Sequence, residues 1–386
     1  MLSFARNTAR PLTSREKVEE EIARGEHVSI IALVDNLLTH AYASRASDIH
    51  LNPLHDSIRV RLRVDGVLQD AFSLPKKIHQ EIISRIKVLT GLRTDEHAAA
   101  QDGRFRVVPQ SGEPVDVRVS ITPTYYGENA VMRLLANTSE EFSLPSLGFS
   151  EEDQKKILKA IKRPHGMILS TGPTGSGKTT TLYTLTKMLS SPDISIVTIE
   201  DPVEYAISDI TQIQINPQTG LTFAKGLRSI LRQDPNIIMV GEIRDAETAG
   251  IAINTALTGH LLLSTLHTSD AATTLPRLLD MGIDSYLIAS TVHLAIGQRL
   301  VRKICTECKG DGCEFCRESG FKGRIGINEV LVVDDEVREA ILRKESAATI
   351  KKIAVKNGMT TMLEDGMRKV DAGLTTKEEV LRVIYE

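Results

Sequence analysis

The chain has 386 residues, a length that suggests two or three domains of ordinary size. Its composition, with 41% hydrophobic and 25% charged residues, is typical of folded enzymes and excludes the disordered and fibrous classes. The net charge of -3 gives no support for sequence-independent nucleic-acid binding, and no direct binding is expected. The sequence also lacks a long apolar run or secretory signal, so we expect a cytoplasmic protein that reaches a membrane only through partners.

The first part of the chain predicts a tail followed by a small domain. Residues 1–27 are of mixed polarity and are typical of a tail or a loosely held helix, to which we assign no role. Apolar residues at helical spacing follow from Val28, and residues 58–64 then alternate apolar side chains with arginines before an Asp-Gly turn. With a further amphipathic helix and three further alternating segments, residues 28–136 are expected to form an α+β domain.

The pattern changes after a Ser/Pro/Gly-bearing linker over residues 137–150. Short, wholly apolar runs separated by helices predict a parallel sheet that is covered on both faces, within a domain that spans residues 151–386. The expected strands are residues 166–170, 194–199, 236–240 and 261–266. A cysteine loop over residues 301–325 and a helical tail over residues 326–386 are expected to complete this domain.

A glycine-rich phosphate-binding loop, or P-loop, follows the first of these strands. Its helix comes directly afterwards, which is the context that this motif requires. Lys178 is expected to reach the β- and γ-phosphates of a nucleotide, and the Thr179 hydroxyl to hold Mg²⁺. The alternative is a glycine-rich turn without a ligand, although chance produces this pattern on the order of once in a hundred such chains. The candidate nucleotide-binding residues of the loop are Gly172, Pro173, Thr174, Gly175, Ser176, Gly177, Lys178, Thr179 and Thr180.

Candidate catalytic side chains follow the other apolar strands. Glu200, Asp201 and Glu204 follow the second strand, Glu242 follows the third and His267 follows the fourth. Because ligands of open α/β sheets bind at the carboxyl ends of strands, these groups are expected to meet beside the P-loop. Each carboxylate alone could equally cap a loop.

All four cysteines lie within one short segment, as two C-x-x-C pairs separated by a glycine-bearing spacer. This spacing predicts a structural, four-sulfur zinc site with no open position for catalysis. The alternatives are reduced free thiols or a redox pair, and a stable disulfide is not expected in the cytosol. The candidate zinc ligands are Cys305, Cys308, Cys313 and Cys316.

Several of these motifs, in this order, resemble the secretion ATPases, which are the assembly motors of type II secretion and type IV pili. The resemblance extends from about residue 28 to the end of the chain. It is carried chiefly by residues 172–181, 198–205, 231–245 and 258–268. It implies an α/β fold with a RecA-like P-loop core, a smaller PAS-like α+β domain, a zinc-binding loop and a helical C-terminal tail.

The resemblance also implies roles for single residues. Glu204 matches the general base or water-positioning group, with Glu200 nearby, and Glu242 matches the acidic residue of the second nucleotide motif. His260 and His267 match the family's histidine box, although His260 alone could be a structural histidine. Arginines in the family reach the nucleotide from the amino-terminal domain and across subunits; without the resemblance, those in strands are more typical of solvated side chains. The matching residues are Arg118, Arg133, Arg228 and Arg232, of which the last two are four apart and are expected on one helix face.

The implied function is that of a hexameric ATPase that adds pilin-like subunits at a pilus or pseudopilus. Its expected partners are further copies of itself, an inner-membrane platform protein and cytoplasmic docking components. Larger family members carry an additional amino-terminal docking domain where this sequence has 27 residues, so the mode of recruitment stays open. The alternatives are a nucleotide-gated regulator without turnover, a metabolic kinase, or a DNA-uptake or retraction motor, although retraction motors generally lack the four cysteines.

Overall fold

The computed structural model describes residues 12–109, 114–135 and 142–385. The chain divides into two compact units, Met1–Ser139 and Glu140–Glu386, and each is described here by itself. The expected linker lies partly at residues 137–141, outside the described residues. Its remainder packs into the second unit, because Leu144 and Phe149 are buried in the core there.

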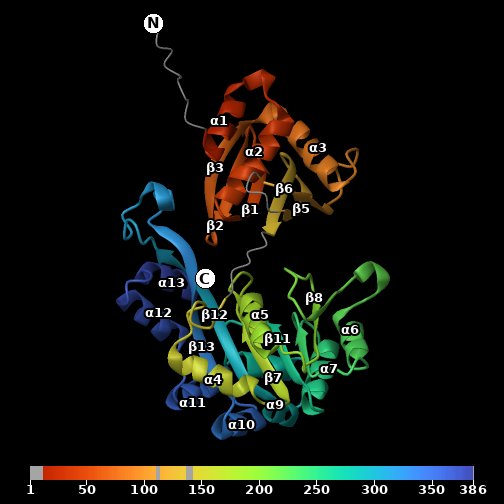
Figure 1. The fold of residues 1–386 in the computed structure, drawn as a ribbon, viewed down its shortest axis with the longest axis vertical. Coiled ribbons are helices and arrows are strands. Elements are labelled where there is room, and N and C mark those ends of the chain that lie inside the picture. Colours follow the sequence, from red (N-terminus) through yellow and green to blue (C-terminus); the bar gives the residue numbers. More distant parts are fainter. Residues whose placement is uncertain (1–11, 110–113, 136–141, 386) are drawn as a thin grey trace. The chain divides into compact units, whose positions relative to one another are not determined.

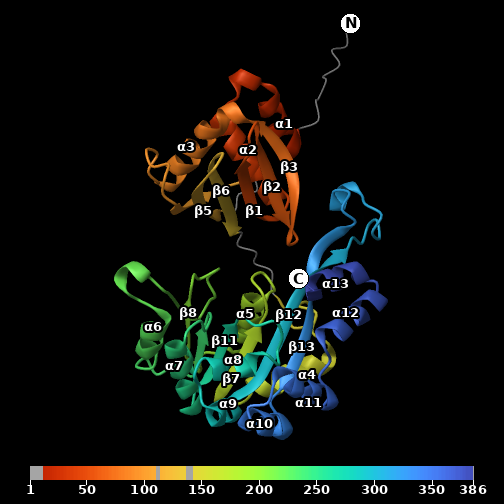
Figure 2. The same cartoon turned by 180° about the vertical axis from the view of Figure 1, so that it is seen from behind.

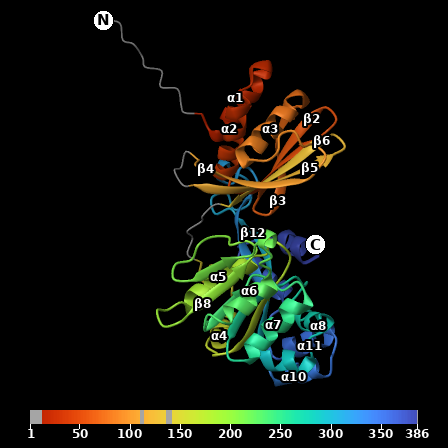
Figure 3. The same cartoon turned by 90° about the vertical axis from the view of Figure 1, so that its right-hand side faces the viewer.

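The first unit is a six-stranded antiparallel sheet in the order β3-β2-β1-β6-β5-β4, with helices on one face (Figure 3). Its strands are β1 (Ala46–Pro53), β2 (Ser57–Val64), β3 (Val67–Pro75), β4 (Gln101–Val107), β5 (Val115–Thr124) and β6 (Gly127–Leu135). Its helices are α1 (Ser14–Ala23), α2 (Ile30–Ala43) and α3 (His79–Thr90). The alternation in β2 explains the two faces, because its apolar residues are buried against the helices and its arginines lie on the other face.

The expected tail contains a well-defined helix within its described part. The Thr13 hydroxyl accepts from the Glu16 amide at the start of α1, and the Glu16 carboxylate accepts from the Thr13 amide, which together make a capping box. Val18 is fully buried in the core of the first unit. Since the helix contributes few other apolar side chains to that core, its sequence resembled a solvated segment.

The second unit is built on a seven-stranded sheet in the order β13-β12-β7-β11-β10-β8-β9 (Figures 1 and 2). All neighbours are parallel except β12 and β13. The strands are β7 (Gly166–Thr171), β8 (Ile196–Glu200), β9 (Thr211–Gln214), β10 (Ile237–Val240), β11 (Leu261–Leu266), β12 (Val292–Ile304) and β13 (Phe321–Val332). The helices are α4 (Glu151–Ile161), α5 (Lys178–Leu189), α6 (Phe223–Ile230), α7 (Ala246–Leu257), α8 (Thr274–Asp280), α9 (Ser285–Thr291), α10 (Asp335–Leu342), α11 (Ala347–Lys356), α12 (Met362–Asp371) and α13 (Lys377–Tyr385).

Helices cover both faces of this sheet, which explains why its four central strands β7, β11, β10 and β8 are buried at every position. In β7, Met167 and Leu169 pack with residues of α6 to α11, whereas Ile168 packs with residues of α4 and α5. Successive side chains of a strand point to opposite faces, so both faces need apolar residues. The four expected strands are therefore present, and they are β7, β8, β10 and β11.

The helical tail was expected to begin at residue 326, and this boundary is wrong. Residues up to Val332 belong to β13, which pairs antiparallel with the long strand β12, and the helices begin only with α10. The cysteine loop is correspondingly shorter, because β12 continues to Ile304 and β13 starts at Phe321.

The strand order brings the predicted site together. β7, β11, β10 and β8 are consecutive neighbours and run parallel, so their carboxyl ends lie along one edge of the sheet.

Among the described residues, every helix is too short or too polar to cross a membrane.

Candidate functional site

The P-loop lies between β7 and α5 and has the backbone that its glycines permit. Gly172, Gly175 and Gly177 have φ values of 146°, 79° and 92°, a region that disfavours side chains. At Gly172, an added Cβ would lie 2.5 Å from both the Gln298 carbonyl oxygen and the Ser176 hydroxyl. The loop therefore needs glycine for close packing as well as for its conformation.

The start of α5 fits an anion. Its N-cap, Gly177, provides no side-chain cap, so the first amides of the helix remain available to a phosphate. The Ser176 hydroxyl is buried and finds no hydrogen-bond partner among the described residues. Thr174 and Thr179 are exposed, Thr180 is half-buried, and the loop residues Pro173 and Gly175 are exposed as well.

Lys178 is the cation of this loop. Its ammonium group donates to the carbonyl oxygens of Gly172 and Pro173, each at 2.8 Å. Burial lowers the pKa of Lys178 to about 8, an effect that Arg299 adds to and that the nearby Glu242 carboxylate opposes. A bound phosphate would supply the negative charge that this buried ammonium group lacks.

Glu242 and His267 come together as expected from the two strand ends. The His267 Nε2 lies 3.2 Å from Glu242 Oε2, and Arg244 Nη2 lies 2.5 Å from Oε1 of the same carboxylate. Glu242 is buried, and Arg244, which the sequence did not single out, has its pKa raised chiefly by this hydrogen bond. The pair therefore places a carboxylate and an imidazole next to the strand that carries the P-loop.

A threonine contact connects the histidine segment to the P-loop strand. The Thr171 hydroxyl, directly before Gly172, contacts the Leu266 carbonyl oxygen at 3.0 Å and the Thr268 hydroxyl at 2.5 Å. The Thr268 amide donates back to the Thr171 hydroxyl at 3.0 Å. The residues on both sides of His267 are thus held against the start of the loop.

Glu200 does not lie open beside the nucleotide loop. It is buried, and its carboxylate accepts hydrogen bonds from Thr198, from Gln212 and from the Tyr183 hydroxyl on α5. These three hydrogen bonds hold the carboxylate in place and occupy most of its acceptor positions. Glu200 therefore lacks the open position that the water-positioning role expected of Glu204 requires.

Glu204 and Asp201 lie in the segment between β8 and β9, and both are exposed. The Glu204 amide donates to the Tyr183 hydroxyl at 3.2 Å. Burial, reinforced by Glu200, raises the pKa of Tyr183, so this hydroxyl stays protonated. Glu204 is thereby connected through its main chain to the helix that carries Lys178.

His260 is not brought to this edge. It directly precedes β11, and its carbonyl oxygen accepts from the amide of Gly166, the first residue of β7. Both strands run from this end toward the P-loop, so a six-residue strand separates His260 from His267, about 20 Å at the usual rise. Within one chain, His260 does not join the candidate site.

Arg228 and Arg232 are exposed near the end of α6. Arg228 pairs with Glu247 at 2.8 Å, and Arg232 donates to the Arg228 carbonyl oxygen at 2.9 Å. The expected shared helix face is wrong in one respect, because α6 ends at Ile230 and Arg232 lies beyond it.

Arg118 and Arg133 belong to the first unit, where they are direct cross-strand neighbours. Arg133 also pairs with Asp48 at 3.0 Å, and Arg118 is aligned with Arg104 on the next strand. Arg63 lies opposite Asp48 on the other side, at 3.8 Å. These five residues form a row across the polar face of the sheet, with a single acid among four arginines.

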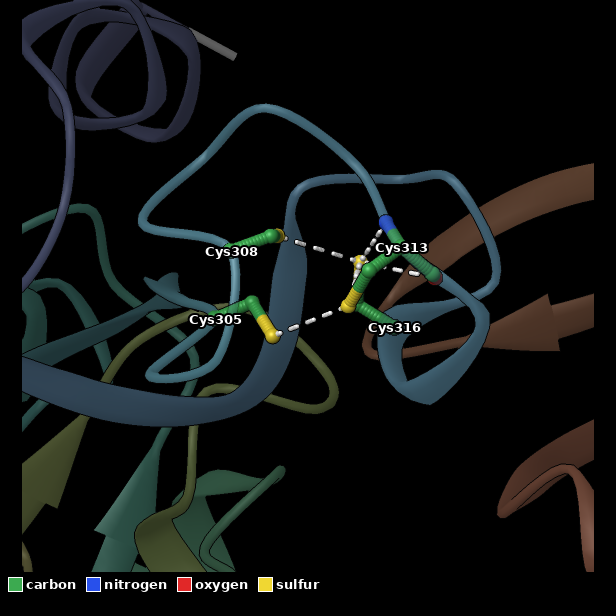
Figure 4. Close-up of side chains that lie close together, drawn as sticks. All are labelled: Cys305, Cys308, Cys313 and Cys316. Atoms are coloured by element: carbon green, nitrogen blue, oxygen red, sulfur yellow. Dashed lines mark hydrogen bonds between the residues drawn. The ribbon is translucent and has the colours of Figure 1, made fainter.

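The four cysteine side chains meet in the loop between β12 and β13, and Figure 4 shows their sulfur atoms turned toward one another. The Sγ–Sγ distances are 3.9 Å for Cys305 and Cys313, 3.6 Å for Cys308 and Cys316, and 3.7 Å for Cys313 and Cys316. A tetrahedral zinc site with Zn–S bonds of about 2.3 Å needs separations of about 3.8 Å. The donors therefore fit a zinc ion.

Comparison with known proteins agrees with this geometry. Residues 23–382 match the family described as Type II/IV secretion system protein. The Type II secretion system protein E of Xanthomonas campestris is 46% identical, over 96% of this chain and 70% of its own length. The Type IV pilus assembly ATPase PilB of Thermus thermophilus is 44% identical, over 95% of this chain but only 45% of its own length.

Two solved structures share the fold. The ATPase DotB of Legionella pneumophila superposes with a TM-score of 0.71 and 26% identity, over 91% of this chain and 95% of its own. The pilus retraction motor PilT with bound ADP gives a TM-score of 0.63 at 26% identity, over 91% and 96%. The expected α/β class is confirmed, and the chain belongs to the Type II/IV secretion system protein family, the family of secretion and pilus assembly ATPases.

Proposed function

We propose that this protein hydrolyses ATP to power the assembly of a pilus or of the pseudopilus of a type II secretion system. The observation that carries the proposal is the row of strand ends β7, β11, β10 and β8, which places the P-loop, His267, Glu242 and the segment of Glu204 along one edge. A cradle for phosphates alone would bind a nucleotide. The neighbouring carboxylates and imidazole supply groups that hydrolysis needs in addition.

We assign different steps of ATP hydrolysis to different residues of the site. Lys178 and the amides of α5 hold the phosphates, because they offer positive charge and free donors at one point. Mg²⁺, held by the Thr179 hydroxyl and by the nucleotide, would neutralise phosphate charge. Glu204 orients the attacking water, and Glu242 and His267 stand beside the phosphates, just after the ends of β10 and β11.

We also propose that the active form is a homohexameric ring. The two expected arginine pairs belong to different units, Arg118 and Arg133 to the first and Arg228 and Arg232 to the second. In a ring, arginines of one unit could neutralise phosphate charge at a nucleotide bound elsewhere. Movement between the units upon hydrolysis would then be the mechanical output.

The partners and the metal follow from the same proposal. The chain would act at the inner face of the cytoplasmic membrane, bound to a platform protein and to cytoplasmic docking components. The cysteine loop would hold one structural zinc ion through its four thiolates, a geometry that the sulfur separations support. The relatives that are 44–46% identical are named as a type II secretion protein and a type IV pilus assembly ATPase, which favours assembly.

The decisive experiment is the substitution Glu204→Gln. We expect ATP hydrolysis to fall by about 100-fold or more, because the carboxylate that orients water is lost, while nucleotide affinity stays within about twofold. Asp209→Asn is the matched control, since Asp209 is exposed in the same segment and Asn tolerates its positive φ of 61°. Unchanged hydrolysis in Glu204→Gln would remove the catalytic assignment.

A further inference from the structure

The Tyr183 hydroxyl joins two parts of the candidate site that are remote in sequence. Tyr183 is fully buried on α5, five residues after Lys178 and four after Thr179. Its hydroxyl donates to the Glu200 carboxylate and accepts from the Glu204 amide. One side chain thus uses both of its hydrogen-bonding capacities to tie the P-loop helix to the acidic segment.

A second side chain holds the same segment from the other side. Gln212 on β9 donates to the Glu200 carboxylate at 3.1 Å and to the Tyr205 carbonyl oxygen at 3.2 Å. The side-chain carbonyl oxygen of Gln212 accepts from the Ile207 amide at 2.7 Å. Three hydrogen bonds therefore hold the main chain from Glu204 to Ile207. The two side chains that make them, Tyr183 and Gln212, also donate to the Glu200 carboxylate.

Ring packing fixes the orientation of the tyrosine. The Tyr183 and Tyr205 rings meet edge to face, with centroids 4.7 Å apart and planes at 79°. Removing only the hydroxyl would leave this packing in place. The hydrogen bonds of Tyr183 can thus be tested apart from its contribution to the core.

From these contacts we infer that Tyr183 and Glu200 are positioning residues, which set the distance of Glu204 from the phosphates held by α5. This inference rests on the proposed role of Glu204 in hydrolysis. It gives Glu200 a role that differs from that of a base, because its carboxylate is the fixed point to which Tyr183, Thr198 and Gln212 all donate. We expect nucleotide binding to be retained without this arrangement, because the contacts of Lys178 within the P-loop run to Gly172 and Pro173.

The test is Tyr183→Phe in the full chain. We expect kcat for ATP hydrolysis to fall by about tenfold to 100-fold, the range caused by small displacements of a reacting group. The KM for ATP and the Kd for ADP should stay within about twofold of the wild type. Tyr205→Phe, which keeps the partner ring, is the matched control and should retain full kcat.

Hydrogen exchange provides the structural readout. In Tyr183→Phe the Glu204 amide loses its acceptor, so exchange in a peptide covering residues 203–207 should accelerate, while peptides from β7 and β11 stay unchanged. Glu200→Gln is the second variant, because an amide in place of the carboxylate disturbs the acceptor for the Tyr183 hydroxyl. It should show the same loss of kcat without loss of affinity.

Two outcomes would overturn the inference. One is a kcat within about twofold of the wild type in Tyr183→Phe, and the other is a parallel loss of kcat and ADP affinity, which would mean that the hydroxyl supports the P-loop as a whole. The two proposals fail separately. An active Glu204→Gln refutes the proposed catalytic role itself, whereas an inactive Glu204→Gln beside a fully active Tyr183→Phe refutes only the positioning role.

Discussion

Replacing Glu379 by Gln should loosen the base of the cysteine loop. Glu379 on α13 is almost completely buried and accepts from the Arg302 guanidinium at 2.7 Å and from Arg382 at 2.9 and 3.0 Å. It also accepts from the Arg302 amide at 3.2 Å. Arg302 lies on β12, three residues before Cys305, and its guanidinium stacks on Phe321 at the start of β13.

The magnitude follows from the pKa of this carboxyl. Burial would raise the pKa of Glu379, but hydrogen bonds from Arg382 and Arg302 outweigh burial and lower it from 4.5 to about 2. At about 1.4 kcal/mol per pKa unit this corresponds to about 3 kcal/mol, which partial exposure of Arg382 reduces to about 2 kcal/mol. We therefore expect Glu379→Gln to lower the free energy of unfolding of the second unit by about 2 kcal/mol.

The pH dependence has a definite sign. Because folding depresses this pKa, the stabilisation is complete above the unfolded value near 4.5 and is lost as the pH falls toward about 2. Wild type and variant should therefore differ at pH 7 and converge in acid. Urea unfolding followed by circular dichroism measures the difference, and hydrogen exchange of residues 298–305 locates it.

The exposed neighbour Glu378 offers the control. Glu378→Gln changes the same charge one residue away and should shift stability by less than about 0.5 kcal/mol. If Glu379→Gln matched this control at pH 7, or if the difference persisted unchanged to pH 2, the reasoning from the buried arginine contacts would be refuted.

Three further predictions test other parts of the molecule. Lys178→Ala should abolish phosphate release from ATP, and retained turnover would contradict the P-loop assignment. Metal analysis should find about one zinc per chain, and less in Cys313→Ser; a stable protein without zinc would contradict the four-thiolate site. Lys351→Met should lower the free energy of unfolding by about 2 kcal/mol, because Lys351 lies 2.9 Å from Asp270 and 3.7 Å from the buried Glu329; an unchanged urea midpoint would exclude this contribution.

Much of the fold could be predicted because the two sheets leave different patterns. Alternating arginines over residues 58–64 indicate one solvated face, whereas residues 261–266 are mostly apolar and are buried at every position because both faces are covered. The strand β13 was missed because Gly323 and Gly326 interrupt its apolar pattern.

The site could be predicted as far as the strand ends allow. A residue that follows a parallel strand lies at the carboxyl edge, which placed Glu242 and His267 correctly in contact. The same rule applied to His260 would have placed it at the opposite edge, since it precedes its strand.

The two-residue period of β8 also indicates on which face of the sheet Glu200 is buried. Val197 and Ile199 face the cluster formed with α6 to α11, whereas Ile196 packs with α4 and α5. A period of two then assigns Glu200 to the α5 face, where Tyr183 lies. The hydrogen bond itself could not be predicted, because it depends on how α5 packs across the sheet.

The long strand β12 connects the cysteine loop to the strand that carries the P-loop. Its Gly297 is aligned with Thr171, the residue just before the P-loop, and the strand then continues to Ile304, directly before Cys305 (Figure 1). Eight residues of extended chain span about 26 Å. The cysteine loop therefore lies at the far end of an extended segment that begins beside the P-loop, so a small tilt of β12 near Gly297 would become a larger displacement at the four cysteines.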